Sequence, residues 1–135
     1  MIPPVLLCYN LEGDRGAKIR MAAMRHRIRL RAVTADEYGQ TLAALCGLED
    51  ATDAVPDGSF TDEMLVMANF PNPLANAFLQ TLRQSRIAPV RLKAMLTPTN
   101  SRWTSLQLHH ELSREDEAFR AHKPAVHDVA GGPLS

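Results

Sequence analysis

The stretch EMLVMANF, from Glu63 to Phe70, decides the fold, because no other segment expected to be a strand is as continuously apolar. A short apolar run bounded by polar and turn residues is typical of a strand that is buried on both faces. We therefore expect this segment to form a central strand, with the other strands beside it and helices over both of its faces.

Three other segments are expected to be strands. Residues Val5 to Tyr9 form a second apolar run that ends in turn residues. The segments RIRLRAV, from Arg27 to Val33, and RLKAMLT, from Arg91 to Thr97, alternate cationic and apolar residues. Strict alternation predicts strands with one exposed face, and cations on such strands are typical of sheet edges.

Helical spacing of apolar residues follows each strand. The helices are expected from Asp14 to His26, from Thr34 or Asp36 through Leu45, from Asn72 to Leu82, and from Ser101 to Phe119. This alternation predicts an α/β fold with a four-stranded, mainly parallel sheet in the order 2-1-3-4 and helices on both faces. The alternative is a ferredoxin-like α+β sandwich with antiparallel pairs and one bare face, which the acidic loop over 49–62 would allow. We see no internal repeat beyond the alternation itself.

A chain of 135 residues is expected to form one domain, over residues 1–122, followed by a disordered tail over residues 123–135. The formal net charge of zero gives no bulk electrostatic reason to expect a nucleic-acid or membrane partner. The apolar run near the N-terminus is too short to span a bilayer and follows no basic leader. We therefore expect a soluble cytoplasmic protein.

Several familiar chemistries lack the residues that they need. Cys8 and Cys46 lie far apart in apolar segments, which predicts buried, reduced thiols. His109 and His110 are adjacent, so on a helix they point about 100° apart and cannot converge on a metal. LEGDRGAK, starting at Leu11, lacks the spacing of a phosphate loop, and no nucleophile elbow is present. We expect no catalytic residue, no metal and no cofactor.

A ligand, if one binds, is expected where the strands end. In a doubly wound sheet the carboxyl ends of neighbouring strands form a crevice at the point where the connections reverse direction. Polar residues follow three of the strands there, and Lys93 and Trp103 would shape the pocket. The candidate ligand-binding residues are Asn10, Glu12, Asn69, Lys93, Thr97, Thr99, Asn100 and Trp103. The TPTN segment is also typical of a tight turn that caps a helix, and both interpretations stay open.

The segments YNLEG, EYGQTLAALCGLED, DEMLVMANF and LKAMLTPTNSRWTSLQLHHELSREDE resemble a small bacterial family known as domain of unknown function 3783. The resemblance runs from Val5 to Phe119. Its most specific part is the pattern K-A-x-x-T-x-x-N-x-x-W, which Lys93, Ala94, Thr97, Asn100 and Trp103 satisfy. The resemblance implies a short cytoplasmic bacterial protein and no particular activity. Family members tend to have a proline-isoleucine-glycine step where residues 41–43 read TLA here.

Three functional hypotheses follow. The first is a non-catalytic module that binds a small ligand or a protein at the crevice, with the partner unidentified. The second is a small transferase or hydrolase in which Lys93 or Glu12 acts in the same crevice. The third, which we do not expect, is a nucleic-acid-associated protein using Arg25, Arg27, Arg29 and Arg31. A homodimer through a helix face or an edge strand stays open.

Overall fold

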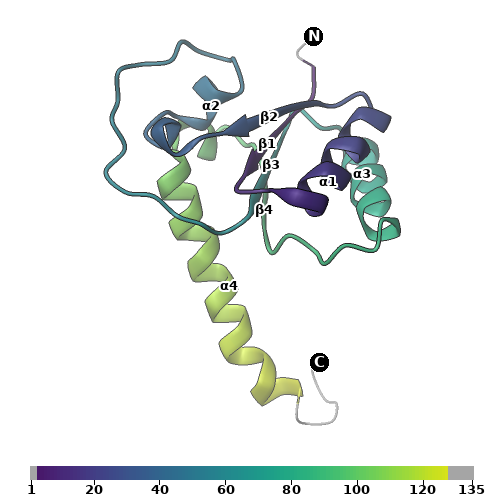
Figure 1. The fold of residues 1–135 in the computed structure, drawn as a ribbon. Coiled ribbons are helices and arrows are strands. Elements are labelled where there is room, and N and C mark those ends of the chain that lie inside the picture. Colours follow the sequence, from purple (N-terminus) through teal and green to yellow (C-terminus); the bar gives the residue numbers. More distant parts are fainter. Residues whose placement is uncertain (1–2, 128–135) are drawn as a thin grey trace.

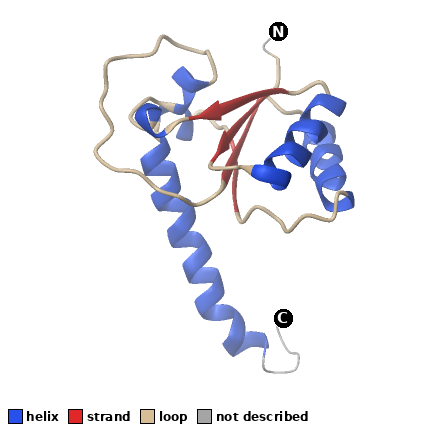
Figure 2. Ribbon diagram, viewed as in Figure 1, coloured by secondary structure: helices blue, strands red, loops and turns tan. Residues whose placement is uncertain are grey.

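The computed structural model describes residues 3–127 as one α/β unit (Figures 1 and 2). The strands are β1 (Val5–Tyr9), β2 (Arg29–Val33), β3 (Met64–Ala68) and β4 (Leu92–Met95). The helices are α1 (Gly13–Arg25), α2 (Leu42–Leu45), α3 (Asn72–Gln84) and α4 (Ser105–His127). Two short 3₁₀ turns, η1 (Ala35–Glu37) and η2 (Asn100–Arg102), precede α2 and α4.

The strand order β2-β1-β3-β4 confirms the predicted order, with β1 and β3 at the centre and the two cation-bearing strands at the edges. The prediction of a mainly parallel sheet is wrong. Strands β1 and β2 are parallel and so are β3 and β4, but the central pair β1 and β3 is antiparallel. A strand buried on both faces is continuously apolar whichever way it runs, so its sequence does not encode its direction.

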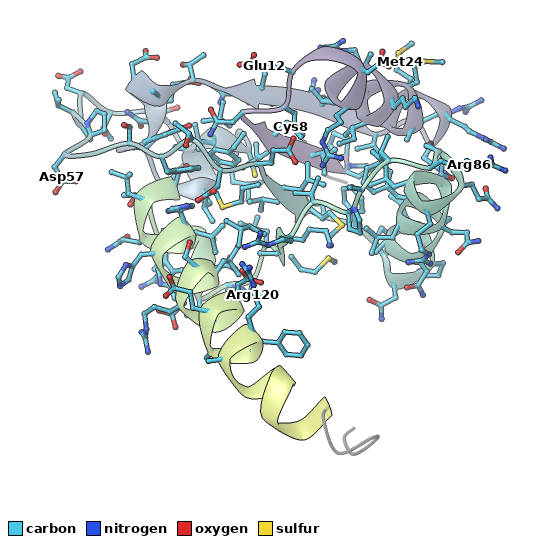
Figure 3. All side chains as sticks on the ribbon, turned by 60° about the horizontal axis from the view of Figure 1, so that its bottom comes forward. Cys8, Glu12, Met24, Asp57, Arg86 and Arg120 are labelled. Carbon is cyan, nitrogen blue, oxygen red and sulfur yellow. The ribbon has the colours of Figure 1, made fainter. Side chains whose placement is uncertain are left out.

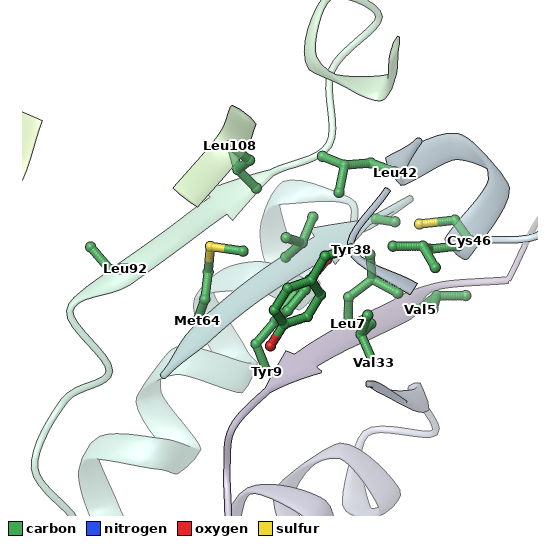
Figure 4. Close-up of a cluster of buried hydrophobic side chains, with 13 residues drawn as sticks. Val5, Leu7, Tyr9, Val33, Tyr38, Leu42, Cys46, Met64, Leu92 and Leu108 are labelled. Atoms are coloured by element: carbon green, nitrogen blue, oxygen red, sulfur yellow. The ribbon is translucent and has the colours of Figure 1, made fainter. Parts of the chain in front are cut away.

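Both faces of the sheet are covered, so the bare face of the ferredoxin-like alternative is absent from the described part of the chain. Helices α1 and α3 lie side by side on one face, and α2 and α4 lie on the other (Figure 1). Every side chain of β1 and β3 is buried, alternate residues facing opposite layers. Figure 4 shows the cluster on the α2 and α4 face, where Tyr9 and Tyr38 pack beside Leu7.

The chain contains two similar halves that the sequence does not reveal: β1-α1-β2-α2 and β3-α3-β4-α4. Leu7 lies opposite Val66 at the middle of the β1–β3 ladder, which places an approximate twofold axis there. Helices α1 and α3 both have 13 residues. On this axis the backbone segments just before α2 and α4 also meet, since Thr41 and Thr104 form an antiparallel bridge.

Unusual backbone conformations repeat in the two halves at the same places. Asn10 follows β1 and Asn69 follows β3, and both have a positive φ, of 60° and 63°. Arg27 follows α1 and Arg86 follows α3, with φ of 58° and 62°. Non-glycine residues rarely adopt this left-handed conformation, so the coincidence supports two copies of one structural unit.

The helices of the α2 and α4 layer differ most from expectation and from each other. The second expected helix is split into η1 and the single turn α2. Helix α4 instead continues through His127, past Phe119 and into the segment expected to be a disordered tail. Its C-terminal part projects beyond the sheet (Figure 1). The rest of that tail lies outside the described residues, as do the first two residues of the chain.

Replacing Arg27 by glycine tests the left-handed conformation that ends α1. The backbone N–H groups of Arg27 and Ile28 donate to Met24 O and Ala23 O at 3.0 and 2.8 Å, as in helix C-caps where glycine is usual. We expect Arg27→Gly to raise the free energy of unfolding by about 0.5–1 kcal/mol in urea denaturation, because glycine relieves the strain at positive φ. The control is Gly47→Ala, at φ 81°, which should lower it by a similar amount. Destabilisation by Arg27→Gly would contradict this account.

Candidate ligand-binding pocket

The antiparallel central pair separates the residues that we expected to share one crevice. The carboxyl ends of β1 and β2 lie at one end of the sheet, and those of β3 and β4 lie at the other. Asn10 and Glu12 are therefore at the first end, while Asn69, Thr97 and the η2 turn are at the second. Any part that these residues play in ligand binding stays a prediction, and it would involve two places rather than one.

The asparagines after β1 and β3 hold the central strands together. The Asn10 side-chain amide donates to the carbonyl of Asp62, just before β3, at 2.9 Å. The Asn69 amide donates to the carbonyl of Pro3, just before β1, at 3.4 Å. The two contacts are equivalent in the two halves. Each closes an end of the β1–β3 ladder, which is a structural reason for an asparagine at each position.

The TPTN segment forms a turn that is closed by its own side chains. Asn100 Oδ1 accepts from the Thr97 N–H at 2.8 Å, and Thr97 Oγ1 accepts from the Asn100 N–H at 3.0 Å. The Asn100 amide also donates to Met95 O at 3.0 Å, at the end of edge strand β4. In the other half Thr34 and Glu37 form the corresponding capping box. The asparagine is buried, so these bonds account for its polar groups.

Replacing Asn100 tests this structural role. We expect Asn100→Ala to lower the free energy of unfolding by about 2 kcal/mol in urea denaturation, because it leaves the Thr97 N–H and Met95 C=O without their partners. Thr99→Ala is the matched control, since the exposed Thr99 side chain makes no hydrogen bond in the described structure, and it should change stability by less than about 0.5 kcal/mol. Equal effects of the two substitutions would show that the turn does not depend on Asn100.

Glu12 and Trp103 lie far apart in the fold. Glu12 lines a cavity of about 310 Å³ with Asn10, Cys8 and Arg20, beside edge strand β2. Trp103 is half-buried against the core on the α4 side, and its carbonyl accepts from the Leu42 N–H at 2.8 Å. Trp103 therefore connects η2 to α2 in the described structure and does not border the same cavity as Glu12 or Lys93.

Lys93 lies at a small apolar pocket between α3 and β4. The pocket has a volume of about 160 Å³, and its wall consists of α3, the segment after α3, and β4. Two cations border it, Lys93 and Arg83, and no acid does. The lining residues are Leu79, Leu82, Arg83, Ile87, Ala88, Pro89, Val90 and Lys93.

The Lys93 ammonium group lacks a counter-charge. Its Nζ donates to the Val90 carbonyl at 2.6 Å, and no carboxylate of the described residues pairs with it. Burial lowers the pKa of Lys93 below its ordinary value, because desolvation disfavours the charged form. An ammonium group can donate three hydrogen bonds, so two donors are left for a bound anion.

A larger cleft of about 450 Å³ lies between α4 and the residues that precede β3 and β4. Most of its charged side chains are already paired. Asp116 Oδ2 accepts from Arg91 at 2.7 Å and lies 3.6 Å from Arg120. Glu63 pairs with Arg15 at 2.6 Å, and Asp62 contacts His109. We therefore regard the smaller Lys93 pocket, where a half-buried cation has no ionic partner, as the better candidate.

Neither the two cysteines nor the polar cluster around His109 forms a nucleophilic catalytic site. Burial raises the pKa of the Cys8 thiol to about 12 and that of Cys46 to about 11, so neither is a thiolate at neutral pH. Asp62 and Ser113 both approach Nε2 of His109, at 2.9 and 3.4 Å. A serine nucleophile and an orienting acid must lie on opposite nitrogens of the ring, so this group is not a triad.

No group of three or more potential metal ligands occurs among the described side chains of residues 3–121, and no described helix is long and apolar enough to cross a membrane. Of the four arginines in the nucleic-acid alternative, Arg31 is paired with Glu37 at 2.7 Å. The other three, Arg25, Arg27 and Arg29, are exposed and have no ionic partner among the described residues.

Sequence reasoning selected Lys93 but missed the apolar wall beside it. Ile87 and Val90 belong to a segment without periodicity. Leu79 and Leu82 belong to the apolar repeat of the helix expected from Asn72 to Leu82, which by itself predicts only core packing. The signal that could have identified the pocket is Lys93 itself. It lies beside the buried Leu65 of the neighbouring strand β3, on the sheet face that packs against the apolar cluster of α1 and α3. A cation on a face that a helix covers needs either a partner or a ligand.

The fold and its pockets define a small α/β domain of two related halves around a mixed sheet. Residues 63–119 match the model of the family described as Domain of unknown function (DUF3783). The match begins just before β3 and ends within α4, so it supports the resemblance for the second half, and the first half lies outside it. Comparisons with curated proteins and with solved structures gave no match.

Proposed function

We propose that this protein is a non-catalytic module that binds a small organic anion with a short apolar tail at the Lys93 pocket. The observation that carries the proposal is a half-buried lysine without an ionic partner in the lining of an apolar cavity. An anionic head group would supply the missing charge and accept hydrogen bonds from Lys93 Nζ. The tail would occupy the space that is lined by Leu79, Leu82 and Ile87.

The size and charge of the pocket limit the ligand. Drug-sized ligands occupy pockets of about 300–1,000 Å³, so a cavity of about 160 Å³ fits only a few carbon atoms. Arg83 lies at the rim with its guanidinium group held by Gln80 at 2.8 Å, and it adds positive potential without being neutralised. These features favour short-chain monocarboxylates over neutral or cationic compounds of the same length.

The absence of an acid, base or nucleophile beside Lys93 supports a binding role over the transferase or hydrolase alternative. Val90 contributes a backbone carbonyl, and the rest of the lining is apolar except for Arg83. Glu12, the other candidate group, lines a different cavity beside β2. A catalytic role for Lys93 would need a second reacting group, and the described lining offers none.

A thermal-shift series against butanoate, pentanoate and hexanoate tests the proposal. At ten times Kd a ligand stabilises the folded state by about 1.4 kcal/mol, which raises the melting temperature by roughly 4–6 °C for a domain of this size. The corresponding alcohols and amines are the matched controls and should produce no shift, because they cannot neutralise Lys93. Equal shifts for acids and alcohols would contradict an anion site.

Replacing Lys93 by methionine separates binding from folding. We expect Lys93→Met to abolish the shift with carboxylates while changing the free energy of unfolding by less than about 1 kcal/mol, because methionine keeps the unbranched chain as far as Cε and avoids burying a charge. Arg102→Met, at an exposed cation outside the pocket, is the control and should keep the shift. If Lys93→Met unfolds the protein, or keeps the ligand response, Lys93 is only a structural residue.

Binding should also depend on pH in a defined direction. A carboxylate binds the charged form of Lys93, whose pKa is lowered by burial, so affinity should fall as pH rises through that lowered value. The fall should begin at a lower pH than for an ordinary lysine. Calorimetric titration of pentanoate between neutral and alkaline pH measures it, with far-UV circular dichroism to confirm that the protein stays folded. An affinity that is constant up to the ordinary lysine range would contradict the lowered pKa.

A further inference from the structure

Charge is distributed unequally between the two layers, although the net charge of the chain is zero. No acidic residue occurs from Arg15 to Ala35 or from Met64 to His110. These two segments contain α3, β4 and all of α1 beyond its first turn. Most of the acids lie instead in the loop over 49–63 and on α4. One face of the molecule is therefore basic in a way that the total charge conceals.

We define the basic face by four exposed cations: Lys18 and Arg25 on α1, Arg27 just after α1, and Arg86 just after α3. None of them forms an ion pair with another described residue. The half-buried Arg15 and Arg31, by contrast, are paired with Glu63 and Glu37. Four unpaired cations on one layer can each contact a phosphate of a polyanion.

The basic face belongs to one layer of the fold, because the last turns of α1 and α3 meet. His26, which ends α1, contacts Oγ1 of Thr81 in the last turn of α3 at 2.7 Å. Its ring also packs edge-on against Phe78, with 6.4 Å between ring centroids. Figure 3 shows Met24 and Arg86 at the same end of the molecule, over α1 and α3. The left-handed conformations of Arg27 and Arg86 end the two helices in the same way.

From this arrangement we infer that the basic face binds the phosphate backbone of a duplex nucleic acid without reading its sequence. Phosphate contacts by Lys and Arg supply nearly all of non-specific binding, and α1 and α3 present such groups from a rigid layer. Single strands are bound by stacking bases on aromatic side chains, and this face exposes no aromatic ring. A membrane partner would require a broad apolar surface, whereas the large exposed apolar residues of α1 and α3 are Met21 and Met24.

The test is fluorescence anisotropy of a labelled duplex DNA and a labelled duplex RNA, titrated with the full chain over a range of salt concentrations. We expect micromolar binding at low salt, with a slope of log K against log salt of about −3.6 for four phosphate contacts. The Arg27→Gly, Arg86→Gly double variant should bind at least about tenfold more weakly and should reduce the slope by about 2. Because glycine suits a positive φ, loss of binding in this variant cannot be ascribed to unfolding.

The control is the Arg114→Gln, Arg120→Gln double variant, which removes two charges from α4 and should keep the affinity within about twofold. The inference is overturned if neither duplex binds at low salt, or if both double variants lose affinity equally. The inference is also overturned if polyglutamate displaces the labelled duplex as effectively as unlabelled duplex does at the same concentration of charge. A membrane-binding surface would replace this inference if the protein bound vesicles containing phosphatidylserine and no duplex. In that case the Met21→Gln, Met24→Gln double variant should lose vesicle binding.

Discussion

The rest of the structure depends on the antiparallel pairing of β1 with β3, which brings Leu7 opposite Val66 at the centre of the sheet. Each of these strands has a parallel neighbour, reached through a helix of 13 residues, so the pairing joins two similar units back to back. Both central strands are buried on both faces. The ladder between them is therefore protected from water, and the hydrogen bonds of Asn10 and Asn69 hold its two ends.

This arrangement accounts for several polar residues that looked like ligand-binding groups. Asn10 and Asn69 close the two ends of the central ladder, and Asn100 holds the turn after β4. Thr34 and Glu37 close the turn that follows β2, just as Thr97 and Asn100 close the turn that follows β4. Repetition of a contact in both halves of a fold is evidence that the contact serves the fold, because a single binding site would need it only once.

The features that do not repeat are therefore of most functional interest. Lys93 is a half-buried cation in the second half, and the first half has Leu30 at the corresponding place beside β1. Most of the acids lie in the loop over 49–63 and on α4, whereas the four unpaired cations of the basic face lie on the layer of α1 and α3. The two proposals concern different sites and ligands of different size. The family match covers the half that contains Lys93, whereas three of the four cations of the basic face lie in the half outside it.

The sequence by itself determined both ends of every strand to within two residues. It also determined the strand order and the central places of β1 and β3. These follow from hydrophobic periodicity, which is local information. Only the tertiary structure decided the direction of β3 relative to β1, since an apolar strand reads the same in either direction and a long irregular loop can return the chain either way. That one choice divided the expected crevice between opposite ends of the sheet. It also placed Lys93, which the sequence marked without its surroundings, at an apolar pocket that residues distant along the chain complete.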